Sequence, residues 1–187
     1  MKKELTRCDF VTQGKELIPY HDLEWGVAVH DDNKLFEILS LGGQQAGISW
    51  LIVFKRRASY RKLFYNFNIK KVAAIKEKEL EVILTNPSII RNRNKIYSII
   101  NNAQKVLEVI KEFGSFSRYI WSFVDFKTIK NKYKHFHDVP ATSEVSKTMS
   151  ADLKKRGFKF TGDIICYSFM QSAGLVNDHS VQCFRYN

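Results

Sequence analysis

Residues 154–169 read KKRGFKFTGDIICYSF, and this stretch decides the fold. Gly157 and Gly162 flank a short aromatic turn between two stretches that we expect to be helical. A tight turn between helices leaves backbone N–H groups unpaired at the start of the second helix, here residues 161–164, where a phosphate binds well. Four basic residues lie beside the turn: Lys154, Lys155, Arg156 and Lys159. The pattern is typical of a helix-hairpin-helix phosphate clamp, although an ordinary corner between two helices with a solvated basic rim explains it equally.

The rest of the chain also has helical spacing. From Ile96 to Ile110 the apolar residues recur at i, i+3, i+4 and i+7 over four turns. Asp31 or Asp32 is suited to cap a helix, and we expect Gly42 and Gly43 to end or bend it. Further helix boundaries are expected near Ser49, Asn86-Pro87, Gly114-Ser115 and Thr142 or Ser143. Residues 127–137 are polar and aperiodic, which predicts a surface loop, and without convincing strand alternation the chain is predicted to be all-α.

Length and charge limit the domain organisation and the partner. The chain has 187 residues, three prolines and no linker-like tract, so we expect a single domain over residues 1–187, with two helical lobes. Thirty Lys and Arg against nineteen Asp and Glu give a net charge of +11. This surplus favours a polyanionic partner, nucleic acid first, although a lysine-rich composition alone produces the same number. No apolar run approaches the roughly 20 residues that cross a bilayer, so no membrane partner is expected.

The two ends of the chain carry matching halves of a metal site. Cys8 and His21 lie near one end and His179 and Cys183 near the other, and together they are the Cys2His2 set of a closed structural zinc. The second pair is four residues apart, so on a helical turn both side chains would face the same way. Against this, an isolated Cys and His pair is usually unrelated to metal. The usual zinc signature also has two pairs of closely spaced ligands, and here only the second pair is closely spaced.

The third cysteine carries no such pattern. Cys166 lies in the apolar run IICYSFM, which is typical of a small buried hydrophobe. An odd cysteine count and the lack of a signal peptide argue against a disulfide framework. We therefore expect a reducing, cytoplasmic compartment.

Three longer motifs resemble the bacterial 3-methyladenine DNA glycosylase I family. They are YHDLEWG at 20–26, GQQAGISW at 43–50 and GFKFTGDIICYSFMQSAGLVNDH at 157–179, and the resemblance runs from Cys8 to Cys183. It implies a helix-hairpin-helix glycosylase fold with an added N-terminal helical region. It also implies one structural Zn2+ that joins the termini through Cys8, His21, His179 and Cys183.

The activity that the resemblance implies is base-excision repair. Such an enzyme flips 3-methyladenine out of alkylated double-stranded DNA and hydrolyses its N-glycosidic bond, leaving an abasic site. The expected partner is duplex DNA carrying alkylated purines, and we expect a monomer associated with the nucleoid.

The resemblance also implies roles for individual residues. Tyr20, Trp25 and Trp50 match an aromatic base pocket, and Ser168 matches a serine that lines it; without the resemblance, these aromatic residues are more often core. Three residues match the turn that enters the gap left by the flipped nucleotide: Gln45, Gly47 and Ile48. Ile48 alternatively begins the core face of the next helix. The hairpin residues expected to contact DNA are Lys155, Gly157, Lys159 and Gly162.

The departures from the family pattern concentrate at the base pocket. Gly42 stands where a glutamate is expected, Leu17 where a tyrosine is usual and Phe10 where a tryptophan is common; the last two remain candidate base-binding residues. Glycine cannot make the charge-assisted hydrogen bond that this glutamate would make with the methylated base, and losing such a bond costs about 1.5 to 3 kcal/mol. Glu37, five residues earlier, would supply the missing carboxylate only if a local bend in the chain redirected it toward the base pocket. No catalytic residue is therefore assigned.

Two functions follow from these departures. The first is a working monofunctional 3-methyladenine glycosylase, of which an enzyme with an altered alkylpurine preference is a variant. The second is a weakly active or non-catalytic relative that binds alkylated DNA. We favour the enzyme, because a cationic base is a good leaving group and the aromatic residues remain.

Overall fold

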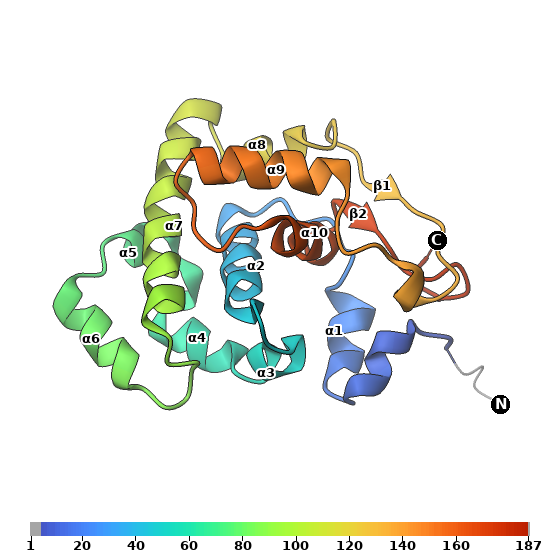
Figure 1. The fold of residues 1–187 in the computed structure, drawn as a ribbon, viewed down its shortest axis with the longest axis horizontal. Coiled ribbons are helices and arrows are strands. Elements are labelled where there is room, and N and C mark those ends of the chain that lie inside the picture. The colour runs from blue at the N-terminus through green and yellow to red at the C-terminus, as the bar shows by residue number, and fades with distance from the viewer. Residues whose placement is uncertain (1–4, 187) are drawn as a thin grey trace.

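The computed structural model describes residues 5–186, and it is built mainly of helices (Figure 1). In chain order the helices are α1 (Leu17–Leu23), α2 (Asp32–Gln45), α3 (Trp50–Phe54), α4 (Arg57–Leu63), α5 (Ile69–Ala73), α6 (Glu77–Thr85), α7 (Arg93–Phe113), α8 (Phe116–Ser122), α9 (Glu144–Lys155) and α10 (Asp163–Ser172). Three short 3-10 turns, η1 (Asp9–Gln13), η2 (Tyr65–Phe67) and η3 (Phe136–Asp138), and two strands, β1 (Ile129–Lys130) and β2 (Val176–Asn177), complete the order. The all-α prediction is confirmed. No helix within residues 5–186 is long and apolar enough to cross a membrane.

Capping side chains set the helix boundaries that the sequence predicts. The Asp31 carboxylate accepts a hydrogen bond from the Lys34 amide at 2.8 Å and starts α2. Ser49 caps α3 and Ser143 caps α9 in the same way. At the other end of α7, Gly114 adopts φ +85°, a left-handed conformation that favours glycine.

Three details differ from the prediction. Gly42 and Gly43 do not end or bend α2, which continues to Gln45. A β-carbon on Gly43 would lie 3.2 Å from that of Phe160, so glycine lets α2 approach the hairpin closely, and this packing outweighs the low helix propensity of glycine. The segment that carries His179 and Cys183 is an irregular turn and not a helix.

The predicted loop at 127–137 contains a strand. Ile129 and Lys130 pair in parallel with Val176 and Asn177, so β1 and β2 form a minimal two-stranded sheet. The strands are too short to leave a period-two pattern in the sequence. Figure 1 shows the sheet beside the C-terminus, near the end of the molecule where both termini lie.

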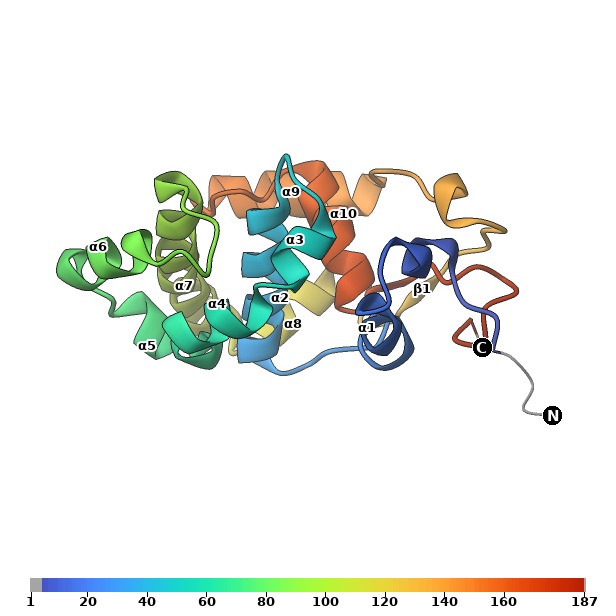
Figure 2. The same cartoon turned by 90° about the horizontal axis from the view of Figure 1, so that it is seen from below.

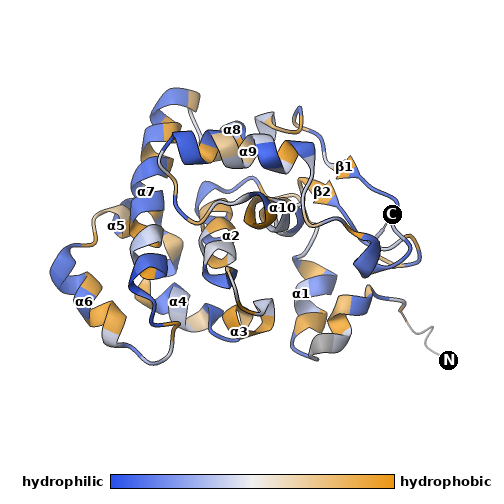
Figure 3. Ribbon diagram, viewed as in Figure 1, coloured by the Kyte–Doolittle hydropathy of each residue, from blue (hydrophilic) through white to orange (hydrophobic). Residues whose placement is uncertain are grey.

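Helix α2 runs through the middle of the molecule, and α7, α8 and α10 pack around it (Figures 1 and 2). The bands of apolar and polar residues along α7 in Figure 3 reflect one buried and one solvated face. A large apolar cluster fills this region, and a second, smaller cluster lies around the N-terminal segment. Trp50 packs against both clusters, so it marks the seam between them.

The turn after α10 lies very close to the backbone of the N-terminal segment. Gly174 has φ +74°, and a β-carbon there would lie 2.4 Å from the backbone of Val27. The Val29 amide also donates to the Ala173 carbonyl oxygen at 3.1 Å. This contact fixes the N-terminal segment against the end of α10, where the cavity described below lies.

Candidate functional site

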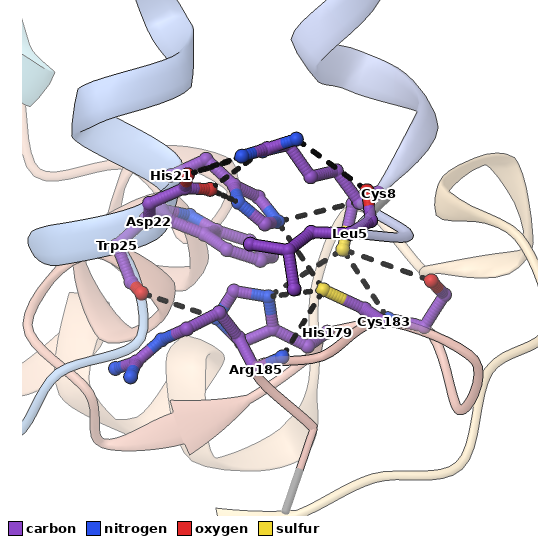
Figure 4. Close-up of polar contacts among 10 residues, drawn as sticks. Leu5, Cys8, His21, Asp22, Trp25, His179, Cys183 and Arg185 are labelled. Atoms are coloured by element: carbon purple, nitrogen blue, oxygen red, sulfur yellow. Dashed lines mark hydrogen bonds and ion pairs between the residues drawn. The ribbon is translucent and has the colours of Figure 1, made fainter. Parts of the chain in front are cut away.

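The structure brings together four buried metal-ligating side chains from opposite ends of the chain (Figure 4). The ligand atoms of Cys8, His21, His179 and Cys183 all lie within 4.8 Å of one another. Figure 4 shows both imidazole rings pointing toward the two sulfur atoms. The group can therefore hold one metal ion, as the sequence predicts.

The spacing of the donor atoms fits a tetrahedral ion. The distance from Sγ to Nδ1 of His179 is 3.5 Å for Cys8 and 3.6 Å for Cys183, and Cys183 Sγ lies 3.4 Å from His21 Nε2. A sulfur and a nitrogen at about 2.3 and 2.0 Å from a common zinc lie roughly 3.5 Å apart at tetrahedral angles. The four donors therefore match the coordination shell of a closed zinc site.

A second set of hydrogen bonds fixes the two imidazoles. His21 Nδ1 lies 2.8 Å from the Asp22 carboxylate, which Arg7 holds at 2.8 Å. His179 Nε2 lies 3.2 Å from the carbonyl oxygen of Trp25. Such partners orient metal-binding rings and choose the nitrogen that faces the ion.

The two cysteines share one proton, and the thiolate is favoured at Cys183. A hydrogen bond from Cys8 lowers the pKa of the Cys183 thiol, and the same bond together with burial raises the pKa of Cys8. Backbone amides of Ser180 and Arg185 each point at a sulfur at 3.4 Å. These donors stabilise negative charge on sulfur, which a metal ligand requires.

Beside this cluster lies a cavity of about 300 Å³ that we call the aromatic cavity. It is lined by Phe10, Leu17, Tyr20, Trp25, Gln45, Ser49, Trp50, Phe136, Ser168, Gln171 and Ser172. All six predicted base-binding residues are among them. The structure thus brings the six together, while their role in base binding stays a prediction.

Five lining residues were not predicted as base-binding. Phe136 comes from η3 and packs on Phe10 at a ring distance of 4.9 Å. Gln171 and Ser172 follow Ser168 by one turn of α10, a spacing that puts them on the same face as a predicted site residue. That spacing could have found them, whereas nothing in the sequence points to Phe136.

The polar atoms of the cavity are mostly neutral. The Tyr20 hydroxyl lies 3.0 Å from Ser172 Oγ, and burial raises the pKa of Tyr20, so its phenol keeps its proton at neutral pH. The Gln171 side chain donates to the buried Asp178 carboxylate at 2.8 Å. Trp50 Nε1 and Gln45 Oε1 are buried and have no hydrogen-bond partner among residues 5–186.

No aspartate or glutamate of the described chain lines the aromatic cavity. Gly42 is buried, and a β-carbon there would meet only Ile165 of α10, at 3.7 Å. Glu37 lines a neighbouring hollow, where its carboxylate pairs with Arg61 at 2.8 Å and Lys34 at 3.2 Å. Glu37 therefore does not replace the missing acid.

The hairpin forms where the sequence predicts it, between α9 and α10. The Asn102 side chain of α7 binds both backbone polar groups of Lys159. It accepts a hydrogen bond from the backbone N–H of Lys159 at 2.8 Å and donates one to the Lys159 carbonyl oxygen at 2.9 Å. Asn101 donates to the carbonyl oxygen of Gly157 at 3.0 Å. The two asparagines thus fix the turn, while the Lys155 and Lys159 side chains stay exposed.

The turn between α2 and α3 lies next to α10. A hollow between them is lined by Gln45, Ala46, Gly47, Ile48, Ser49, Ile164, Ile165 and Ser168. Gly47 stands at an exposed position with φ +74°, whereas Ile48 is half-buried against the large core. The first turn of α10 also carries Asp163, paired with Lys154 at 3.4 Å, so one acid accompanies the basic residues there. Three of the predicted DNA-contacting residues, Gln45, Gly47 and Ile48, line this hollow. The contact of all the predicted residues with DNA stays a prediction.

The sequence and the fold both match known glycosylases. A family profile described as methyladenine glycosylase matches residues 10–186. DNA-3-methyladenine glycosylase 1 of Escherichia coli (strain K12) is 45% identical over 182 residues, which cover 97% of each chain. A crystal structure of 3-methyladenine DNA glycosylase I superposes with a TM-score of 0.93 at 45% identity, over 97% of this chain and 100% of that one.

A further solved structure holds a ligand. It is a tyrosine-to-phenylalanine variant of 3-methyladenine DNA glycosylase I in complex with 3-methyladenine, with a TM-score of 0.93 at 35% identity over 97% of both chains. The profile match includes the aromatic cavity, the hairpin and every residue of the metal cluster except Cys8, and the relatives each cover 97% of the present chain. The chain therefore belongs to the methyladenine glycosylase family of enzymes.

Proposed function

We propose that the protein is a monofunctional DNA glycosylase that flips 3-methyladenine out of alkylated duplex DNA and hydrolyses its N-glycosidic bond. The observation that carries this proposal is the aromatic cavity, which lies beside α10 and the α2–α3 turn. The relatives named for this activity, and the solved complex with 3-methyladenine, support it.

The lining of the cavity suits a flat cation. Methylation at N3 gives adenine a positive charge, and Tyr20, Trp25 and Trp50 offer aromatic faces around the cavity. A cation on such a face gains roughly 0.5 to 2 kcal/mol. Neutral adenine lacks this gain, so the cavity favours the damaged base.

The chemistry needs little help from an acid or a base. The positive charge weakens the bond between the base and the sugar and makes the base a good leaving group. Tyr20 stays protonated, so its phenol serves as a hydrogen-bond donor or acceptor and not as a phenolate base. Extruding the nucleotide and holding the cationic base are therefore the main tasks of the protein.

The metal that we propose at the four-ligand cluster is one Zn2+ with a structural role. All four positions would be filled by protein atoms, so none is open for a catalytic water. Tyr20 and His21 lie in α1, and Trp25 follows the end of this helix. Because His21 is one of the four ligands, the cluster holds the segment with Tyr20 and Trp25 against the C-terminal turn. The zinc therefore shapes one wall of the cavity.

The assembly that we propose is a monomer. A single 187-residue domain carries both the hairpin and the α2–α3 turn, so one copy can engage one lesion. The net charge of +11 favours a protein that resides on DNA, in the cytoplasm and at the nucleoid.

A second candidate function rests on Gly42. Without a carboxylate in the cavity, the protein binds alkylated DNA but releases base weakly or not at all. The hairpin and the metal cluster are intact under both candidates, so only the rate of base release separates them.

The deciding experiment identifies both products. Zinc-loaded protein is incubated with duplex DNA carrying radiolabelled methyl groups, released bases are separated by chromatography, and abasic sites are counted by alkaline strand cleavage. We expect 3-methyladenine and an equal number of abasic sites. Tight binding of the DNA without either product would support the second candidate instead.

A further inference from the structure

The segment that leads from β1 to η3 carries three lysines to which the proposed function gives no role. Exposure alternates along this segment: Lys130, Lys132 and Lys134 are exposed, whereas Asn131 and Tyr133 between them are half-buried. Successive side chains of an extended chain point to opposite faces, so the three lysines share one face at intervals of about 6.6 Å. We call these three residues the lysine row.

The backbone beneath the lysine row is held by the C-terminal turn. The Asn131 amide donates to the carbonyl oxygen of Asn177 at 3.1 Å, and the Asn131 side chain donates to the buried Asp178 carboxylate at 2.7 Å. The Val181 amide donates to the carbonyl oxygen of Tyr133 at 2.8 Å. The lysines therefore project from a fixed backbone, and a partner binds them without the entropic cost of ordering a loop.

The charge of the lysine row is not neutralised by the described part of the chain. None of its three ammonium groups forms an ion pair with an aspartate or glutamate among residues 5–186, and Lys130 packs over the Tyr186 ring at 4.3 Å. Asp138, the next acid along the chain, lies 3.3 Å from His137. Neighbouring cations without counter-charges attract a partner whose negative charges are also regularly spaced, as the phosphates of a nucleic-acid strand are.

The lysine row lies on the opposite side of the aromatic cavity from the hairpin. Phe136 of η3 lines the cavity and follows Lys134 by two residues. Because η3 precedes α9 and the hairpin follows it, the two lie toward opposite ends of this helix (Figures 1 and 2). Helix α9 has 12 residues. Its length is therefore about 18 Å, which equals the rise of roughly five base pairs.

We propose that the lysine row is a second DNA-contacting surface, which binds phosphates on the flank of the lesion that the hairpin does not reach. The inference deepens the proposed function, because it rests on duplex DNA as the partner. A duplex whose flipped nucleotide enters the cavity meets the hairpin on one flank and the lysine row on the other. Contacts to phosphate hold the strand in place and carry no information about base sequence.

Fluorescence anisotropy at several salt concentrations tests the contact without base release. The probe is a duplex with a tetrahydrofuran abasic analogue at its centre. We expect Lys132→Ala/Lys134→Ala to bind several-fold more weakly and to reduce the slope of log affinity against log salt by about 2, one for each lost phosphate contact. The charge-preserving Lys132→Arg/Lys134→Arg should keep the wild-type slope. So should the matched control Lys76→Ala/Lys78→Ala, which removes two exposed lysines of the same spacing at the start of α6.

Two further duplexes separate a local contact from a general effect of charge. In each of them the analogue lies near one end, so that double-stranded DNA extends on one side only. Lys132→Ala/Lys134→Ala should weaken binding to one of these duplexes and leave the other nearly unchanged. Equal losses on both duplexes would overturn the inference, because net charge alone would explain them. A wild-type slope on every duplex would overturn it as well.

Release of 3-methyladenine distinguishes failure of the inference from failure of the proposed function. Lys132→Ala/Lys134→Ala should need more protein for half-maximal release and should keep the wild-type single-turnover rate at saturation. If the wild type releases base and this variant binds DNA as the wild type does, only the inference is wrong. If the wild type neither binds the duplex nor releases base, the proposed function fails, and the inference falls with it.

Discussion

The sulfur atom of Cys8 lies 3.5 Å from Nδ1 of His179, although the two residues are 171 positions apart in sequence. The contact closes the N-terminal segment onto the C-terminal turn, and Tyr20 and Trp25 belong to the same apolar cluster as Cys8 and Cys183. Trp25 touches His179 directly, with ring centroids 4.6 Å apart. The metal cluster and one wall of the cavity are therefore a single packed unit.

Removal of the metal is expected to lower stability and to loosen this wall. Gently purified protein should contain one zinc per chain, and a chelator or Cys183→Ser should lower the melting temperature, because buried thiolate and imidazole donors lose their common partner. Calorimetry and metal analysis measure both effects. The matched control is Cys166→Ser, whose buried sulfur lies outside the cluster and which should keep its zinc. A zinc content near zero in the wild type would contradict the assignment.

The exposed lysines of the hairpin are expected to contact phosphates. Lys155→Ala and Lys159→Ala should each weaken DNA binding uniformly across sequences and reduce the slope of log affinity against log salt by about 1. Fluorescence anisotropy at several salt concentrations measures this slope. Lys78→Ala removes an equally exposed charge from α6, away from the hairpin (Figure 2), and should leave the slope nearly unchanged. Equal slopes in all three variants would place the DNA elsewhere.

Asp152 is expected to stabilise the start of the hairpin in a pH-dependent way. Its carboxylate accepts hydrogen bonds from Tyr119 at 2.7 Å and Arg156 at 2.8 Å. Burial alone would raise the pKa of Asp152, but the hydrogen bonds from Arg156 and Tyr119 outweigh it, so the pKa lies below its usual value. A lowered folded-state pKa gives stability that is present above the unfolded pKa of about 3.9 and is lost as pH falls through the folded value.

Urea unfolding at pH 7, 4 and 3 tests this linkage. Asp152→Asn should lower the free energy of unfolding at pH 7 by about 1 to 2 kcal/mol, and the difference from the wild type should shrink below roughly pH 4. Taking the difference removes the effect of acid on the metal cluster, which both proteins share. A difference that stays constant between pH 7 and pH 3 would contradict the charge-based role.

Much of the fold and the site could be predicted because local chemistry decides them. Asp31, Ser49 and Ser143 cap helices through bonds to amides two or three residues away, so a short window of sequence is sufficient. The Cys and His residues at the two ends of the chain predict the four metal ligands, and the family resemblance supports them and implies the six cavity residues.

The remaining features depend on contacts between distant segments. Asn101 and Asn102 anchor the hairpin from α7, more than fifty residues away, whereas Asn68 and Asn92 use the same type of side chain to cap a helix. Gly43 stays helical because its missing side chain admits Phe160, and no local rule contains that neighbour. Phe136 reaches the cavity from a polar stretch with no periodicity.

The central claim is that the protein works as a glycosylase although Gly42 leaves the cavity without a carboxylate. A β-carbon at position 42 fits at an ordinary contact distance from Ile165, so Gly42→Glu should fold. Its added charge-assisted hydrogen bond should raise the rate of release roughly ten- to a hundredfold, and the isosteric, neutral Gly42→Gln should gain less.

The most direct measurement is the single-turnover rate of 3-methyladenine release from alkylated duplex DNA by zinc-loaded wild-type protein, beside Gly42→Glu and a heat-inactivated control. We predict a wild-type rate clearly above the control and below that of Gly42→Glu. Release by the wild type no faster than by the heat-inactivated control, with zinc bound and Gly42→Glu active, would show that the natural protein binds alkylated DNA without excising the base.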